Sequence, residues 1–102
     1  MRGVAEPEEL DRVFGALAHQ TRRAILSVLH ANRAVMTSGA IAARFSCSWP
    51  TTSRHLGVLE DAGLVQALLR GRERVYGLDT DRLRTLTTGW INRFDDDEDE
   101  DE

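Results

Sequence analysis

One stretch of the sequence, residues 48–78, constrains the fold most strongly, because it predicts a helix with defined ends followed by a β-hairpin. Ser48 is a good N-cap residue, and Pro50 is tolerated in the first turn because the amide that proline lacks would be unpaired there. Gly63 lies where a C-cap glycine would end the helix. The sequence therefore predicts a helix between Ser48 and Gly63 whose two ends are both marked.

The residues before Ser48 predict three more helices. Residues 8–18 and 21–31 both place apolar side chains at helical spacing, which indicates two amphipathic helices. Thr37 is placed to cap a short third helix, and residues 46–47 form a tight turn into the helix that Ser48 caps. A short helix, a turn of about three to four residues and a longer helix together make a helix-turn-helix.

The residues after Gly63 predict a hairpin and a last helix. Residues 64–78 are expected to form two strands around Gly71, because glycine takes positive φ at little cost in a hairpin turn. The stripe of the last helix consists of Leu83, Leu86, Trp90, Ile91 and Phe94. The predicted order, α-α-α-α-β-β-α, is that of a winged helix-turn-helix, a mainly helical α+β fold.

The distribution of charge divides the chain into a folded part and a tail. A chain of 102 residues with 41% hydrophobic residues supports one domain with a modest core, and we assign this domain to residues 1–94. Residues 95–102 are all acidic and have no apolar side chain to bury, so we expect a disordered tail. The formal net charge of -4 is misleading, because residues 12–94 hold twelve bases, all arginine, against five acids.

The helix after Ser48 carries side chains suited to the major groove of DNA. A helical wheel turns Thr52, Leu56 and Leu59 toward the core, and Arg54 points the opposite way. Short hydroxyl side chains allow close approach to DNA, and an arginine can bridge O6 and N7 of guanine. The candidate DNA contacts on this helix and on the hairpin are Ser48, Trp49, Thr51, Thr52, Ser53, Arg54, His55, Arg70, Arg72 and Arg74.

Two of these assignments have a structural alternative. The hairpin carries Arg70, Arg72 and Arg74 around its glycine, which fits contacts with phosphates or the minor groove. The alternative is a solvated hairpin tip whose charges protect an exposed edge from aggregation. Trp49 either packs on a sugar or a thymine methyl, or braces the turn as a partly buried aromatic residue.

Four segments of the chain resemble the ArsR/SmtB winged-helix repressors of bacteria: residues 16–26, 50–56, 59–65 and 71–78. The match spans roughly residues 10–92 in the right order and spacing, which is more specific than one short pattern. The resemblance implies a sequence-specific transcriptional regulator that binds a palindromic double-stranded DNA operator as a homodimer. Repression is favoured by the family, although the sequence does not distinguish a repressor from an activator.

The resemblance also implies that the first and last helices build the dimer. The apolar stripes agree with this, because they hold more large side chains than so small a core can easily bury. The candidate interface residues are Val13, Phe14, Leu17, Leu83, Leu86, Trp90 and Ile91.

The sequence does not identify a signal that the protein senses. Metal-sensing members of the family use a Cys-x-Cys pair at the positions of Thr37 and Gly39, neither of which supplies a thiolate. The histidines His19, His30 and His55 lie on separate predicted elements. We therefore expect no cofactor and no metal site. The alternatives are a Ni(II), Zn(II) or Co(II) site of histidines and carboxylates, or a separate sensor or effector protein as a partner.

Other classes of protein fit the sequence less well. An enzyme is not expected, because the sequence lacks a nucleophile paired with a base and a phosphate-cradling glycine loop. A winged helix used for protein contact is the main alternative function, since a basic face also suits an acidic protein. No segment is apolar enough to cross a membrane, and the N-terminus lacks the pattern of a signal peptide, so we expect a cytoplasmic protein.

Two features have more than one interpretation. The acidic tail either aids solubility, competes with DNA for the arginines, or binds a partner or cations. Cys47 is either a small buried core residue or a redox-active thiol just ahead of a helix N-terminus. We favour the solvated tail and the buried cysteine.

Overall fold

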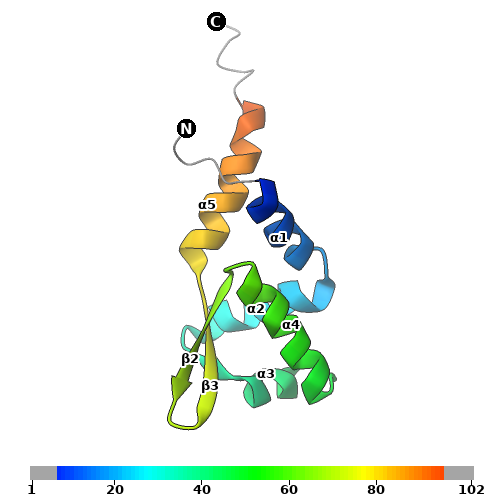
Figure 1. The fold of residues 1–102 in the computed structure, drawn as a ribbon, viewed down its shortest axis with the longest axis vertical. Helices are drawn as coiled ribbons and strands as arrows, with labels where there is room; N and C mark the ends of the chain where they lie inside the picture. The colour runs from blue at the N-terminus through cyan, green and yellow to red at the C-terminus, as the bar shows by residue number, and fades with distance from the viewer. Residues whose placement is uncertain (1–6, 96–102) are drawn as a thin grey trace, which may run out of the picture.

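The computed structural model describes residues 7–95 and has the predicted winged helix-turn-helix architecture (Figure 1). Its elements are, in order, α1 (Pro7–Leu17), α2 (Gln20–Asn32), β1 (Met36–Thr37), α3 (Ser38–Arg44), α4 (Trp49–Asp61), β2 (Val65–Arg70), β3 (Glu73–Leu78), α5 (Thr80–Ile91) and the 3-10 helix η1 (Asn92–Asp95). The sequence does not predict β1, because a strand of two residues is too short to show alternation.

Short-range hydrogen bonds define the ends of the helices as predicted. The Ser48 hydroxyl accepts a hydrogen bond from the amide of Thr51 at 3.2 Å and so caps α4. The Thr37 hydroxyl caps α3 in the same way at 3.0 Å. Gly63, just after the end of α4, has a φ of 78°, the conformation in which glycine is favoured over other residues.

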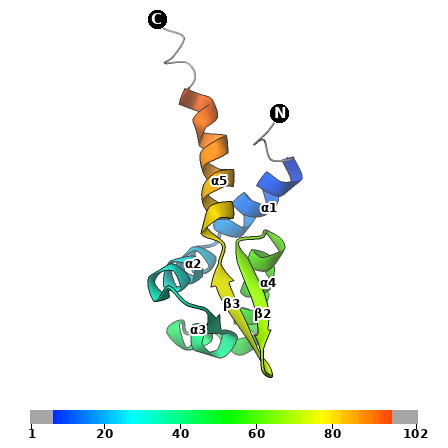
Figure 2. The same ribbon diagram turned by 90° about the vertical axis from the view of Figure 1, so that its left-hand side faces the viewer.

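The three strands form one antiparallel sheet in the order β1-β3-β2. Strands β2 and β3 make the hairpin, which we call the wing, and pair from Val65 opposite Leu78 to Arg70 opposite Glu73. Gly71 in the turn has the predicted positive φ, at 67°. The wing lies at one end of the molecule and α5 runs toward the other (Figure 2).

The core lies between the first four helices and the base of the wing. Its largest fully buried side chains are Ile25, Ile41, Leu56, Leu59, Leu64, Val13, Val65 and Thr52. Leu56 and Leu59 confirm the core face assigned to α4. Val13 is 0% exposed, so it has no surface to offer a partner, and its assignment to the dimer interface is wrong.

Helix α5 has no buried residue and lies beside α1 (Figure 1). Phe14 of α1 contacts Trp90 edge-on with ring centroids 5.3 Å apart, and Trp90 contacts Phe94 at 5.1 Å. Ile91 and Phe94 are 52% and 63% exposed. An apolar surface is therefore left open at the end of the molecule away from the wing.

Three other candidate interface residues are partly buried against the core: Leu17, Leu83 and Leu86.

Two residues at the start of α5 join it to the rest of the fold. The Asp79 carboxylate caps α5 by accepting from the amide of Arg82 at 3.1 Å, and it also accepts from the Gln66 side chain at 3.3 Å. The Arg82 guanidinium donates to the carbonyl of Ala62 at 3.0 Å and to the Glu9 carboxylate at 3.3 Å. These bonds connect α1, the end of α4, β2 and the start of α5. Within residues 7–95, no helix has the length and apolar character to span a membrane.

Candidate nucleic-acid interface

Helix α4 carries six of the predicted DNA contacts, and their exposure differs. Arg54 is exposed, while Ser53 and His55 are half-buried. Thr52 is only 2% exposed, and its hydroxyl donates to the carbonyl of Ser48 at 3.1 Å. Thr52 therefore belongs to the core, as its place on the helical wheel indicates, and its assignment as a DNA contact is corrected.

The first turn of α4 presents small hydroxyls and an aromatic ring. Trp49 is 60% exposed, which favours a ring that faces a binding partner over one that braces the turn. The Ser48 hydroxyl donates to the hydroxyl of Thr51 at 3.0 Å, and this first turn holds no acidic residue. The end of the helix is therefore open to a negatively charged ligand.

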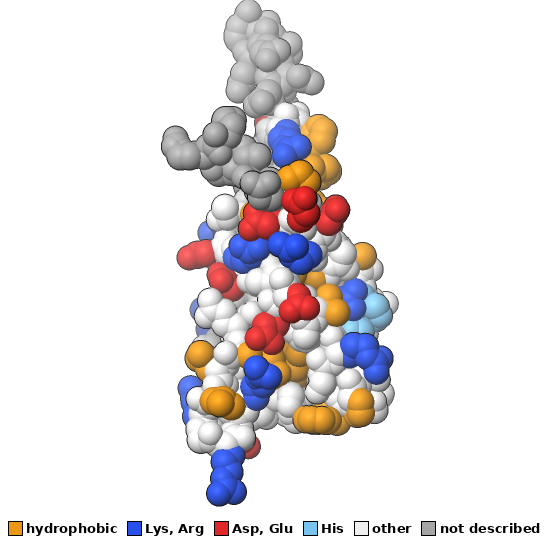
Figure 3. Space-filling view, viewed as in Figure 1, with side chains coloured by type: hydrophobic (Ala, Val, Ile, Leu, Met, Phe, Trp, Pro, Cys, Tyr) orange, Lys and Arg blue, Asp and Glu red, His pale blue; other side chains and the backbone are white. Residues whose placement is uncertain are grey.

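A hollow of about 550 Å³ lies between α4 and the wing. Ser53, Gly57 and Glu60 line it from α4, and Arg72, Glu73 and Arg74 line it from the wing. Together with Arg70 these arginines are exposed, and arginine side chains are visible at the wing end of the molecule (Figure 3). Exposed arginines of the wing therefore border one flank of α4.

The opposite flank of α4 meets the turn between α1 and α2. The ring centroids of His55 and His19 lie 4.6 Å apart, and Nη1 of Arg22 lies 3.3 Å from Nδ1 of His55. Arg22 also donates to the carbonyls of Ala16 and Gly15 at 2.9 and 3.1 Å. These bonds hold the guanidinium between the turn and α4. Figure 3 shows histidine and arginine side chains gathered along this side of the molecule.

The surroundings of His55 disfavour its charged form. Burial is the main cause that lowers the pKa of His55, and electrostatic repulsion from His19, Arg22 and Arg54 lowers it further. The sequence does not indicate this pair, because the two residues are far apart in the chain. The only sequence signal that could have indicated it is the position of His55 at the border of the core face of α4.

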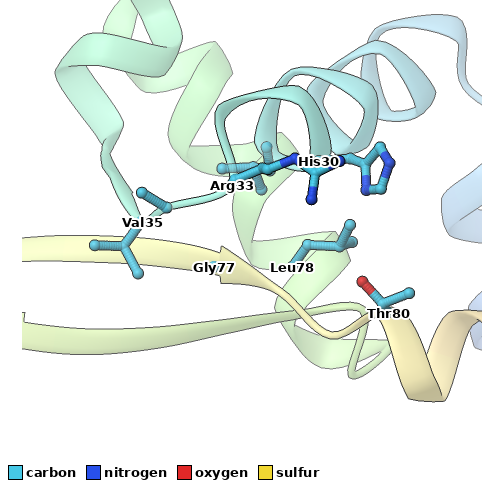
Figure 4. Close-up of a pocket in the computed structure, with 8 residues that line it drawn as sticks. His30, Arg33, Val35, Gly77, Leu78 and Thr80 are labelled. Carbon is cyan, nitrogen blue, oxygen red and sulfur yellow. The ribbon is translucent and has the colours of Figure 1, made fainter.

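The third histidine lies elsewhere. His30 and Arg33, at the end of α2, border a separate hollow of about 400 Å³ (Figure 4). Leu78 and Thr80 line the same hollow where β3 passes into α5. Across residues 7–95 no group of three or more histidine, cysteine or carboxylate side chains is arranged to hold a metal ion.

Two expectations about the chain remain predictions. Cys47 is free and half-buried, so it is less enclosed than the core residue that the sequence predicts. The acidic segment 95–102 lies outside the described residues except for Asp95. The domain boundary at residue 94 and the role of the tail are therefore untested.

Comparisons with known proteins agree with this geometry. Residues 17–66 match the model of a family described as a helix-turn-helix domain. The transcriptional repressor SdpR of Bacillus subtilis (strain 168) is 34% identical over 85 residues, which cover 83% of this chain and 91% of SdpR.

Two solved structures are similar over nearly the whole chain. The ArsR family transcriptional regulator RHA00566 has a TM-score of 0.81 and 28% identity, over 95% of this chain and 97% of that one. The homodimeric winged helix-turn-helix DNA-binding domain (fragment 1-100) of Mb0332 from Mycobacterium bovis has a TM-score of 0.68 and 25% identity. That match covers 96% of this chain and 92% of the Mb0332 fragment.

Proposed function

Because the chain belongs to the ArsR family of winged helix-turn-helix transcriptional regulators, we propose that it represses transcription by binding a palindromic DNA operator as a homodimer. The family consists of DNA-binding regulators and not of enzymes. Repression is supported by the similarity to SdpR, which is named a transcriptional repressor.

The arrangement of arginines around α4 carries this proposal. Arg54 projects from the exposed side of a helix that ends in hydroxyls, and the wing arginines lie across the hollow beside it. In the complex α4 occupies the major groove, where Arg54 contacts base edges, and the wing contacts phosphates or the minor groove. The proposed contact set is Ser48, Trp49, Thr51, Ser53, Arg54, His55, Arg70, Arg72 and Arg74.

The dimer is supported by the open apolar surface at the other end of the molecule. Trp90 contacts both Phe14 and Phe94, and Ile91 and Phe94 are more than half exposed. Pairing two copies through α1 and α5 buries this surface and leaves both α4 helices free. A two-fold dimer of this kind fits two half-sites about one helical turn apart.

The DNA assignment is tested by fluorescence anisotropy on duplexes from the region upstream of the chain's own gene. Arg54→Ala and Arg72→Ala should each weaken binding, Arg54→Ala by about fivefold to more than a hundredfold if it contacts a guanine. Arg93→Ala is the matched control, because Arg93 is exposed in η1, away from α4 and the wing. The proposal fails if no duplex binds, or if all three variants bind as the unchanged protein does.

The dimer assignment is tested by analytical ultracentrifugation. Phe94→Ser should shift the protein toward a monomer, because it removes an exposed ring from the apolar surface of α5. Leu69→Ser is the control, since Leu69 is 76% exposed on β2, away from this surface. Equal dissociation constants for the two variants would contradict the proposed interface.

A further inference from the structure

We propose that His19, Arg22 and His55, which we call the corner cluster, bind a phosphate of the DNA backbone on the flank of α4 opposite to the wing. The inference rests on the proposed function, because it adds a contact to the same DNA complex. It assigns a ligand to two residues, His19 and Arg22, that lie outside the helix-turn-helix and the wing.

The position of the corner cluster relative to α4 is the first support. A helix in the major groove, which is about 12 Å wide, has a phosphate backbone on each side. The hollow with Arg72 and Arg74 borders one flank of α4, and the corner cluster borders the other. The wing therefore faces one backbone, and the corner cluster faces the other.

The hydrogen bonds of the corner cluster define which protons it offers. A guanidinium only donates, so Nδ1 of His55 accepts from Arg22, and this ring is neutral with its proton on Nε2. The amide of Thr21 donates to Nδ1 of His19 at 3.2 Å, which makes His19 the N-cap of α2 and fixes the same tautomer. Neither Nε2–H has a partner among the hydrogen bonds within residues 7–95. Two imidazole donors and a guanidinium are thus available to phosphate oxygens.

The corner cluster also lacks a negative partner. The charged groups that act on His55 are His19 from the α1–α2 turn, Arg22 from α2 and Arg54 from α4 itself. All of them are basic side chains, and the first turns of α2 and α4 contain no acidic residue. A DNA phosphate supplies the counter-charge that the described part of the chain does not place there.

Because the corner cluster lacks a counter-charge, the phosphate contact should make the affinity for DNA depend on pH. In the free protein, burial and basic neighbours hold the pKa of His55 below its usual value. A bound phosphate favours the charged form and raises that pKa, so the complex binds more protons than its free components. The added proton takes Nδ1 of His55, which then no longer accepts from Arg22. The affinity for DNA therefore rises as the pH falls from the pKa in the complex to the pKa in the free protein. Uptake of one proton corresponds to a gain of at most about tenfold per pH unit.

The test measures dissociation constants of the full chain for its best upstream duplex between pH 8.0 and 5.5 at constant ionic strength. His55→Gln keeps an acceptor for Arg22, and His19→Asn keeps an N-cap for α2, but neither side chain titrates. His30→Gln is the matched control, because His30 is exposed at the other end of α2. The unchanged protein and the control should gain about threefold to tenfold per pH unit within this window. The His19→Asn/His55→Gln double variant should lose most of that gain.

The possible results separate this inference from the proposed function. A double variant with the pH dependence of the unchanged protein, or an affinity that is constant or falls toward acid pH, overturns the phosphate contact. If Arg54→Ala still weakens binding in that case, the proposed function stands without it. Failure of every duplex to bind at any pH overturns both.

Discussion

Replacing Gly63 by alanine tests how the end of α4 is joined to α5. Gly63 has a φ of 78°, and holding an L-residue in this region costs roughly 1–2 kcal/mol. An added Cβ would overlap the Nε and Cδ atoms of Arg82, which must then move away. Arg82 would lose its hydrogen bond to the carbonyl of Ala62. A hydrogen bond from a charged donor contributes about 1.5–3 kcal/mol, and we take the lower part of this range because Arg82 is partly exposed. We expect Gly63→Ala to lower the free energy of unfolding by about 2.5–4 kcal/mol.

Urea unfolding followed by circular dichroism measures this change, with both proteins at one concentration because the proposed dimer would contribute to stability. Gly57→Ala is the control, since Gly57 lies within α4 and an added Cβ meets nothing within 4 Å. That variant should gain about 0.5–1 kcal/mol from the higher helix propensity of alanine. The reasoning is refuted if Gly63→Ala is as stable as the unchanged protein or as Gly57→Ala.

Three other changes test the capping of α4, the titration of His55 and the acidic tail. Ser48→Ala removes the N-cap of α4 and should lower the free energy of unfolding in urea by about 1 kcal/mol. Ser46→Ala, at an exposed position, is the control and should change it by no more than about 0.5 kcal/mol. Equal losses of stability in the two variants would contradict the capping role of Ser48. The pKa of His55 is lowered in the folded chain, so the unfolded chain binds more protons below about pH 6.5. The free energy of unfolding of the DNA-free protein therefore falls as the pH drops below that value. Urea unfolding of His55→Gln should show a weaker fall, and a fall equal to that of the unchanged protein would contradict the lowered pKa. Removing residues 95–102 should tighten DNA binding in anisotropy at about 0.01 M salt but not at about 0.15 M, where the Debye length is about 8 Å instead of 30 Å. The seven residues after Asp95 span at most about 25 Å. Helix α5 and strand β3 follow one another along the molecule (Figure 1) and have a combined length of about 40 Å. The tail therefore acts on the wing only through long-range electrostatics, and a gain in affinity that persists at the higher salt would contradict this.

The parts of the fold that the sequence predicts well are those that a few neighbouring residues determine. Ser48 and Thr37 cap helices through bonds to amides only three residues away. Gly71 sets the hairpin turn through its own φ. The strand β1 has no such signal, because its two residues are defined only by their pairing with Val75 and Tyr76 of β3.

The parts of the fold and the site that the sequence does not indicate depend on contacts between distant segments. Val13 and Phe14 belong to one apolar stripe, and spacing alone does not reveal that Val13 is enclosed while Phe14 contacts Trp90. The hydroxyl of Thr52 suits DNA in chemical type but is buried by the packing of α4. His19 and His55 meet only because the α1–α2 turn packs against α4.

The Asp79 junction makes the wing a lever arm attached to α5. Because Asp79 caps α5 and accepts from Gln66 of β2, it joins the base of the hairpin to the start of the helix. The six residues of β3 give this arm a length of about 20 Å, so a rotation of about 10° moves the wing tip by about 3.5 Å. That displacement is close to the spacing of about 3.4 Å between base pairs. In a dimer joined through α5, a change of about 10° in the angle between α5 and its partner helix would therefore shift each wing tip by about one base-pair step.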